Sequence, residues 1–377
     1  MDALMLPSNW QKVRLGDILT LKHGRDYKNF KLGNIPVYGS GGYMLSINNF
    51  LHNGESVCIG RKGTIDKPIY LNGKFWVVDT LFYSYSFKKS IPKFIFYAFF
   101  IIKWSNYNEA TGVPSLTKMT ISNIEIPLPP LNEQIAIANI LSGLDRYLYN
   151  LDALILKKES VKKALSFELL SQRKRLKGFN QAWQRVRLGT YKYRRGSFPQ
   201  PYGNPQWYSD NGMPFVQVYD VGENFKLTQR TKQKISRIAQ PMSVFVPKNS
   251  VIITLQGTIG RVALTQYDCY CDRTILIFDN HTLNDVNKYF FVLSLFTKFE
   301  EEKRKADGSI IKTITKQTLK DFEIPLPPLN EQIAIADILS ALDKEITSLK
   351  NKKRQFENIK KALNHDLMSA KIRVLKK

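Results

Sequence analysis

Two segments of this chain have nearly identical sequences. PLPPLNEQIAIANILSGLD occupies residues 127–145, and PLPPLNEQIAIADILSALD occupies residues 325–343. The repeat is wider than this, because WQKVRLG at residues 10–16 returns as WQRVRLG at residues 183–189. Repeat units of nearly 200 residues are far longer than those of a solenoid. The duplication therefore predicts two copies of one domain, each followed by the same connecting segment.

The segments between these shared frames differ from each other. SVCIGRKGTI at residues 56–65 has a counterpart, SVIITLQGTI, at residues 250–259, but residues 17–125 and 190–323 otherwise share few identities. This pattern indicates that the geometry of the two copies was kept while their surface chemistry diverged.

The chain is predicted to contain two α+β domains and two helical connectors. Strand-like runs such as FWVVDTLFYSYSF and RTILIFDN alternate with helical patches such as DVNKYFFVLSLFTKFEEEKRK. The glycines of KGTI and QGTI are expected at hairpin corners. We predict a first globular domain at residues 1–130, a helical spacer at 131–177, a second domain at 178–328 and a second spacer at 329–377.

Both connectors have the sequence of a long helix. Asn132 is expected to cap the first of these helices, with Glu133 in its first turn. Leucine and isoleucine then follow the 3–4 spacing of a coiled-coil seam: Leu141, Leu144, Leu148, Leu151 and Ile155, and Leu339, Leu342, Ile346 and Leu349 in the second connector. Lys353 and Lys360 interrupt the second seam. An antiparallel coiled coil with an internal pseudo-twofold repeat is favoured, and the alternative is that each helix packs on its own domain.

The charge of the chain favours a polyanionic partner. It has 56 Lys and Arg against 32 Asp and Glu, for a net charge of +24. The excess lies on both predicted domains, with 15 basic and 8 acidic residues in 1–130 and 22 and 13 in 177–328. Because basic residues release counterions from phosphates, double-stranded DNA is the expected partner. The longest apolar run, FIFYAFFII, is too short for a membrane span, and the three scattered cysteines favour a reducing, cytoplasmic location.

Recognisable catalytic motifs are absent from the sequence. GRKGT lacks the order and spacing of a phosphate-binding loop, and no Asn-Pro-Pro-aromatic or Asp-Pro-Pro-aromatic run marks an amino-methyltransferase. Cys269 and Cys271 with four scattered histidines do not form a zinc pattern. We therefore expect no catalytic residue and no metal ligand, although spatial pairing of the histidines stays open.

The chain resembles the specificity subunit of type I restriction–modification enzymes over essentially its whole length. The doubled W-Q-[KR]-V-R-L-G motif, the doubled PLPPLNEQIAIA motif and the basic helical connectors carry the resemblance. It implies that the two bodies are target recognition domains, each reading half of a bipartite, asymmetric DNA sequence, and that the helices set the unread gap. It also implies two modification (methyltransferase) subunits and restriction (translocase-nuclease) subunits as partners. S-adenosylmethionine, ATP and Mg²⁺ would be bound by those partners, with no cofactor on this chain.

Candidate site residues follow from side-chain type and position. The candidates for contacts with DNA bases or phosphates are Tyr38, Ser40, Arg61, Lys62, Lys67, Arg194, Arg195, Gln217, Gln256 and Arg261. The resemblance points to the duplicated frames for partner docking, at Leu131, Glu133, Gln134, Ile137, Leu329, Glu331, Gln332 and Ile335. The alternative for the apolar members of this second set is the coiled-coil core.

Two other functions remain open from the sequence. The chain could be a self-sufficient DNA-modifying enzyme with an unrecognised site, or a dimeric DNA-binding regulator without enzyme partners. Incubation of the purified chain with DNA, Mg²⁺, ATP and a methyl donor separates the first of these from a non-catalytic reader.

Overall fold

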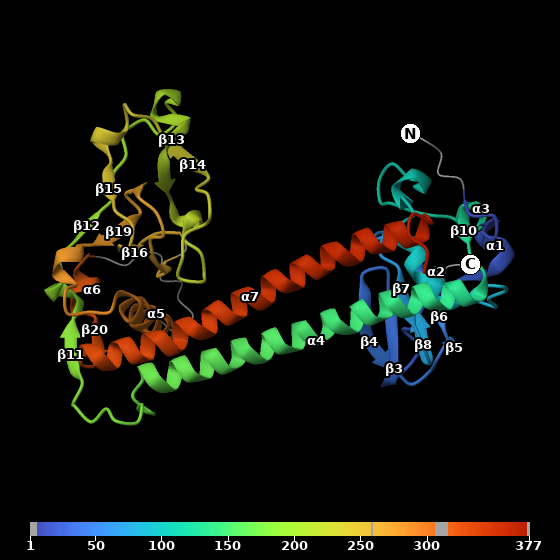
Figure 1. Ribbon diagram of the computed structural model, residues 1–377, viewed down its shortest axis with the longest axis horizontal. Coiled ribbons are helices and arrows are strands. Elements are labelled where there is room, and N and C mark those ends of the chain that lie inside the picture. Colours follow the sequence, from blue (N-terminus) through green and yellow to red (C-terminus); the bar gives the residue numbers. More distant parts are fainter. Residues whose placement is uncertain (1–5, 258, 306–315, 375–377) are drawn as a thin grey trace. The chain divides into compact units, whose positions relative to one another are not determined.

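The chain folds into two compact units that share two long helices. The computed structural model describes residues 6–257, 259–305 and 316–374. Unit 1 contains Met1–Leu154 and Leu349–Lys377, and unit 2 contains Ile155–Ser348. The helices α4 (Leu131–Leu170) and α7 (Leu329–Met368) therefore each contribute to both units (Figure 1). The two helical spacers predicted from the sequence are present as helices, but each compact unit includes part of both.

Unit 1 contains two four-stranded sheets and a two-stranded frame. The frame pairs β1 (Gln11–Arg14) with β10 (Glu125–Leu128). The first sheet has the order β2 (Thr20–His23), β9 (Leu81–Tyr85), β6 (Ser56–Gly60), β7 (Ile69–Leu71), and the second has the order β4 (Gly42–Ile47), β3 (Leu32–Gly39), β8 (Lys74–Val77), β5 (His52–Asn53). The short helices are α1 (Leu15–Ile18), α2 (Pro92–Phe99) and α3 (Lys118–Asn123).

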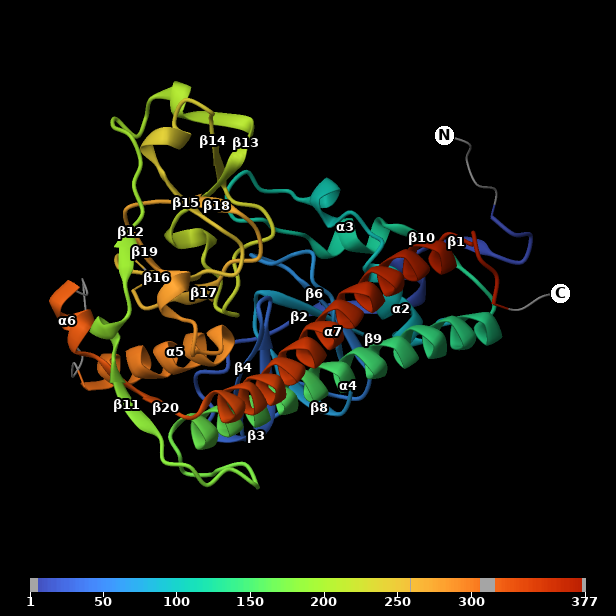
Figure 2. The ribbon, with the colours of Figure 1, turned by 60° about the vertical axis from the view of Figure 1, so that its left-hand side comes forward.

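Unit 2 repeats this topology strand for strand. Its frame pairs β11 (Gln184–Arg187) with β20 (Glu323–Leu326). Its sheets have the orders β12 (Tyr193–Arg195), β19 (Ile275–Phe278), β16 (Val251–Thr254), β17 (Val262–Leu264) and β14 (Gln233–Ile235), β13 (Tyr208–Val216), β18 (Cys269–Cys271), β15 (Val244–Val246). Its helices are α5 (Lys288–Lys305) and α6 (Lys316–Asp321), and Figure 2 shows α5 lying beside the start of α7. The predicted duplication of an α+β domain is confirmed.

Each hydrophobic core is closed by both long helices. In unit 1 the buried Ile137 and Leu141 of α4 and Leu367 of α7 pack into the cluster around Phe94. In unit 2 the quasi-equivalent layer contains Leu169 and Leu170 of α4 with Ile335 and Leu339 of α7. The C-terminal end of α4, which begins in unit 1, is thus buried in the core of unit 2. The C-terminal end of α7, which begins in unit 2, is buried in the core of unit 1. The alternative in which each helix packs only on its own domain is excluded.

The two helices pair antiparallel within each unit. In unit 1 Lys353 Nζ lies 2.6 Å from Asp152 Oδ1, and Lys360 pairs with Asp145. In unit 2 Lys158 Nζ lies 2.8 Å from Glu345 Oε1, and Lys162 pairs with Asp343. In both units, residues later in α4 pair with residues earlier in α7, as an antiparallel pair requires. The lysines that interrupt the predicted seam are used here as cross-helix ion pairs.

Two of these aspartates, Asp145 and Asp343, also bind a tyrosine of their unit. Tyr97 Oη donates to Asp145 Oδ2 at 2.6 Å in unit 1, and Tyr289 Oη donates to Asp343 in unit 2. Burial and the hydrogen bond to Asp145 raise the pKa of Tyr97, and burial and Asp343 likewise raise the pKa of Tyr289. These contacts attach α2 and α5 to the helix pair.

Candidate nucleic-acid interface

Three loops of unit 1 meet at one end of its sheets. They follow β3 (residues 40–41), β6 (residues 61–68) and β8 (residues 78–80), and we call them loop cluster 1. Arg61 N donates to Thr80 O at 2.8 Å, and Val78 N donates to Tyr38 O at 2.9 Å. Gly63 has φ +83°, and a Cβ added there would lie 3.3 Å from Ser40 Oγ, so the first loop touches the second.

Unit 2 builds the same arrangement from different residues. Loop cluster 2 follows β13 (residues 217–222), β16 (residues 255–257 and 259–261) and β18 (residues 272–274). Leu255 N donates to Thr274 O at 2.9 Å, and Asp272 N donates to Val216 O at 3.0 Å. A Cβ added at Gly257, where φ is +71°, would lie 3.6 Å from Val218 Cγ2. The hydrogen bonds and the glycine contact match those of loop cluster 1 position by position.

This match defines which residues of the two clusters correspond. Ser40 corresponds to Val218, Arg61 to Leu255, Lys62 to Gln256 and Asp79 to Arg273. Every one of these pairs differs in charge, polarity or hydrogen-bonding capacity, although the backbone that presents them is the same. Such a scaffold is suited to presenting two different recognition surfaces.

The predicted DNA contacts of unit 1 gather in loop cluster 1. Ser40, Arg61, Lys62 and Lys67 belong to it, and Tyr38 precedes it in β3. Lys62 and Lys67 are exposed, whereas Tyr38, Ser40 and Arg61 are half-buried. Arg61 Nη1 donates to Asp79 O at 3.1 Å, so part of its guanidinium is used to join two loops.

The predicted contacts of unit 2 do not all come together. Gln217, Gln256 and Arg261 belong to loop cluster 2, but Arg194 and Arg195 lie on β12, outside it. Arg194 Nη2 donates to Phe245 O at 3.0 Å.

Arg261 has a structural role that its sequence position did not reveal. Its Nη1 donates to Val221 O at 3.1 Å, and its Nη2 pairs with Glu223 Oε1 at 2.9 Å. Both contacts go to the segment that follows β13. Arg261 therefore braces two loops, and its contact with a base or a phosphate of DNA stays a prediction.

Sequence reasoning missed several exposed apolar side chains beside the clusters. Tyr43 is 62% exposed and Met44 is 47% exposed, and both lie near the start of β4, just after loop 40–41. Tyr219 is 44% exposed in loop cluster 2. Arg273 is also exposed there. These residues belong to no sequence motif. They can be recognised as candidates only because the structure shows which loops lie together.

The duplicated frames are held by buried ion pairs. Arg373 donates to Glu133 through Nε at 2.7 Å and Nη2 at 3.0 Å, and Trp10 Nε1 donates to the same carboxylate at 3.1 Å. In unit 2 Arg175 donates to Glu331 at 3.2 and 2.6 Å, and Trp183 Nε1 donates at 3.0 Å. The tryptophan of one motif and the glutamate of the other therefore meet in space.

The neighbouring glutamines are buried in the same way. Gln134 accepts from Ile91 N at 3.0 Å and donates to Pro129 O at 2.8 Å. Gln332 accepts from Asn287 N at 2.9 Å and donates to Pro327 O at 2.8 Å. Each glutamine therefore ties the start of a long helix to the domain before it.

These contacts correct the predicted docking set. Six of its eight members are at least 98% buried within the chain: Glu133, Gln134, Ile137, Glu331, Gln332 and Ile335. A side chain without accessible surface makes no direct contact with another subunit, so only Leu131 and Leu329 remain available.

The predicted N-cap is also wrong, because α4 begins at Leu131 and Asn132 lies inside its first turn.

Three apolar side chains are exposed at the start of each long helix. We call Leu131, Ile135 and Ile140 docking face 1, and Leu329, Ile333 and Ile338 docking face 2; all six side chains are 38–49% exposed. The pattern of buried and exposed positions is identical over residues 131–140 and 329–338. The chain thus presents the same set of exposed apolar side chains once in each unit.

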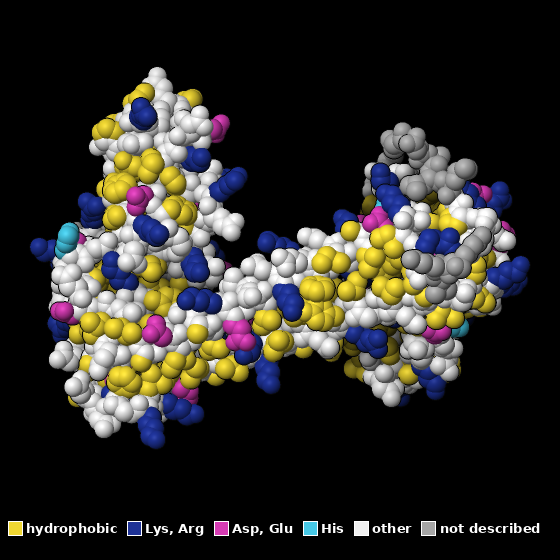
Figure 3. All heavy atoms as spheres, viewed as in Figure 1, with side chains coloured by type: hydrophobic (Ala, Val, Ile, Leu, Met, Phe, Trp, Pro, Cys, Tyr) yellow, Lys and Arg dark blue, Asp and Glu magenta, His cyan; other side chains and the backbone are white. Residues whose placement is uncertain are grey.

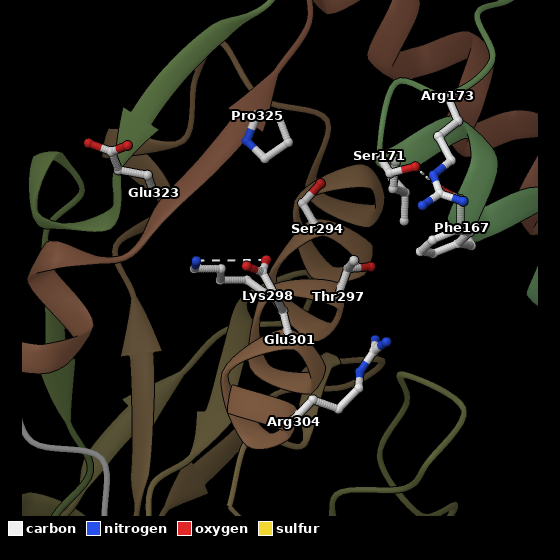
Figure 4. Close-up of a pocket in the computed structure, with 11 residues that line it drawn as sticks. Phe167, Ser171, Arg173, Ser294, Thr297, Lys298, Glu301, Arg304, Glu323 and Pro325 are labelled. Carbon is white, nitrogen blue, oxygen red and sulfur yellow. Dashed lines mark hydrogen bonds and ion pairs between the residues drawn. The ribbon is translucent and has the colours of Figure 1, made fainter. Parts of the chain in front are cut away.

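Basic side chains are spread over both units (Figure 3). A cavity of about 470 Å³ in unit 2 is lined by Arg173, Lys298 and Arg304 among others (Figure 4). Lys298 is paired with Glu302 at 2.8 Å, and no residue of either loop cluster lines this cavity. Over residues 6–257, 259–305 and 316–374, we find no group of three acidic, His or Cys residues able to hold a metal and no helix that could span a membrane.

A duplicated basic domain with divergent loop clusters on a common scaffold defines a two-site nucleic-acid-binding protein. The chain belongs to the family of type I restriction modification DNA specificity domains, whose model matches residues 7–159 and 203–358. As a member of that family it is a DNA-recognition chain and not a catalytic one.

The individual proteins that this chain resembles are named as specificity subunits. The chain is 25% identical over 423 residues to the type I restriction enzyme MjaVIII specificity subunit of Methanocaldococcus jannaschii, across 99% of this chain and 95% of that protein. It is 29% identical over 276 residues to a putative MjaX specificity subunit of the same organism, across 70% of this chain but only 63% of that protein. It also shares its fold with an S subunit from M. genitalium, with a TM-score of 0.65, 17% identity and coverage of 97% and 98%.

Proposed function

We propose that this chain is the specificity subunit of a type I restriction–modification enzyme and reads a bipartite DNA target. Loop cluster 1 reads one half-site, and loop cluster 2 reads the other. The observation that carries this proposal is the correspondence of the clusters, in which one backbone scaffold presents Arg61 and Lys62 in unit 1 but Leu255 and Gln256 in unit 2. Different side chains at matched positions favour different bases, so the target is asymmetric.

Partner docking uses the two apolar faces. Docking faces 1 and 2 are matched in residue type and exposure, so two copies of one partner bind equivalently. That partner is the modification subunit, and restriction subunits join the resulting complex. The buried Glu133 and Glu331 clusters act indirectly, because they fix the start of α4 and of α7 and thereby hold the exposed residues in place.

The helix pair sets the unread gap of the target. α4 and α7 are continuous over 40 residues each, or about 60 Å at 1.5 Å per residue. Both pass from one unit to the other, and ion pairs join them within each unit. A stiff connection fixes one spacing between half-sites, whereas a flexible one allows many.

S-adenosylmethionine, ATP and Mg²⁺ belong to the partner subunits in this proposal. Such a division of labour leaves this chain without catalytic activity of its own. A self-sufficient DNA-modifying enzyme is the competing function, and it requires a catalytic site on this chain.

Methylome sequencing of cells that express the chain with its modification subunit tests the proposal. We expect methylation at one asymmetric sequence with a fixed gap, and no methylation when the chain is omitted. The purified chain alone, given DNA, Mg²⁺, ATP and methyl donor, is expected to leave the DNA unaltered. Modification or cleavage by the chain alone would favour the competing function.

A further inference from the structure

The segment that follows β3 and the segment that follows β13 occupy the same place in the two units. β3 pairs in parallel with β8 through Val37–Trp76 and Tyr38–Val77, and β13 pairs with β18 through Phe215–Tyr270 and Val216–Cys271. Counting on from this register, Gly39, Ser40 and Gly41 correspond to Gln217, Val218 and Tyr219. The contacts of Ser40 with Gly63 and of Val218 with Gly257 independently give the same correspondence.

In unit 1 this segment presents apolar groups. Gly41 and Gly42 have nothing within 4 Å of an added Cβ, so the turn itself is bare. Tyr43 and Met44 follow it, exposed, while the Tyr43 ring packs edge-on against Tyr38 at 6.1 Å between centroids. A Cβ added at Gly39 would lie 3.0 Å from Met44 Sδ, so Gly39 leaves room for that side chain.

In unit 2 the same segment presents a polar group. Tyr219 Oη donates to Gln217 Oε1, which orients the amide. Among the described residues nothing accepts a hydrogen bond from Gln217 Nε2, so its two N–H groups remain available. Lys232 Nζ lies 5.1 Å from the centroid of the Tyr219 ring and adds positive charge beside the amide.

We propose that these two segments are the base-reading elements of the chain, and that they read by opposite chemistry. Met44 and Tyr43 contact the methyl group of a thymine in the half-site of unit 1. Gln217, oriented by Tyr219, donates to an acceptor on a base edge in the half-site of unit 2. Neighbouring Lys62, Lys67 and Lys232 neutralise phosphates and contribute affinity without sequence preference. The inference rests on the proposed function and assigns its specificity to particular residues.

The test uses the complex with modification subunits and a duplex carrying the target found by methylome sequencing. Each thymine is replaced in turn by deoxyuridine, which removes only the methyl group. We expect one replacement in the half-site of unit 1 to weaken binding about fourfold, because one buried methyl is lost. In Met44→Ala or Tyr43→Ala complexes the same replacement is expected to have no further effect. Tyr149→Ala, which removes an exposed tyrosine of α4, is the control and should keep the fourfold effect.

The second arm changes the donor of unit 2. Gln217→Glu replaces the amide N–H groups with an acceptor, and we expect about 10- to 100-fold weaker binding to the native half-site with altered preference at one base pair. Gln355→Glu, an exposed position on α7, makes the same charge change and should alter no preference. Unchanged preference at the half-site of unit 1 shows that the variant is folded.

Two results would overturn the inference. One is a loss of affinity in Gln217→Glu that is equal for all sequences, because that identifies a phosphate contact. The other is an unchanged response to every deoxyuridine in Met44→Ala and Tyr43→Ala. Failure of the proposed function looks different, since the wild-type complex would then have no bipartite target.

Discussion

Arg373 and Glu133, 240 positions apart in the sequence, form a bidentate ion pair with N–O distances of 2.7 and 3.0 Å. Its counterpart in unit 2 joins Arg175 to Glu331, and the sequence offset between the two arginines equals that between the two glutamates. The arginine that pairs with Glu133 of α4 thus follows α7, and the arginine that pairs with Glu331 of α7 follows α4.

Loss of this ion pair is expected to destabilise unit 1. In Arg373→Ala the carboxylate of Glu133 stays buried without its charge partner, which costs about 3–5 kcal/mol in free energy of unfolding. Urea unfolding measures the change. Arg187→Ala removes the exposed pair with Glu323 and should cost less than about 1 kcal/mol. Equal losses for the two variants would contradict the structural role of the pair.

Alkaline pH is expected to weaken both units through Tyr97 and Tyr289. The pKa of each is raised in the folded chain, whereas in the unfolded chain each ionises near 10. Above about pH 10 the unfolded chain therefore releases protons that the folded chain retains, and the free energy of unfolding falls as pH rises. Unfolding at about pH 9 and 11 should show a shallower fall in a Tyr97→Phe, Tyr289→Phe variant. Tyr149→Phe, at an exposed position, should not change the slope.

Charge on the docking faces is expected to change stoichiometry. Ile135→Glu places a carboxylate on docking face 1, and desolvating it in an interface is unfavourable, so one modification subunit should be lost. Ile135→Glu with Ile333→Glu should lose both. Size-exclusion chromatography with light scattering gives the masses. Leu156→Glu changes an exposed leucine of α4 outside both faces and should retain two subunits.

Exchange of one domain is expected to change one half-site. Replacing residues 17–125 by the corresponding body of another family member preserves the frames and the whole of unit 2. Methylome sequencing should then show a new sequence in one half and the original sequence in the other. A change in both halves would mean that the units do not read independently.

Lengthening the helix pair is expected to lengthen the gap. Four residues inserted after Leu154 and four after Ser348 add about 6 Å to each helix, equivalent to about one to two base pairs. The half-sites themselves should stay the same. If the gap also stays the same, the helices do not determine the spacing.

The fold was largely predictable because its signals are local. The duplicated motifs and the 3–4 spacing of Leu141, Leu151 and Ile155 are properties of short segments, and these residues are buried as expected. Lys353 and Lys360 interrupt the apolar heptad pattern in the sequence. Their role could not be predicted locally, because their acidic partners lie on the other helix.

The site was less predictable because it depends on distant segments. Glu133 looked like a surface residue of a first helical turn, and nothing near it in the sequence indicates that Arg373 covers it. Tyr43 and Gln217 become comparable only after strand register aligns them. The basic charge indicated DNA, but which side chains are free to contact it depends on hydrogen bonds such as those of Arg261.

The placement of Arg373 also affects the order in which the protein matures on the ribosome. Unit 2 is built from the single stretch 155–348, so all its residues have been synthesised before residue 349 is added. Unit 1 receives its core residue Leu367 and its arginine only later. Domains usually fold in the order of their synthesis, but the N-terminal body of unit 1 cannot complete its core until the residues that follow Ser348 have been made.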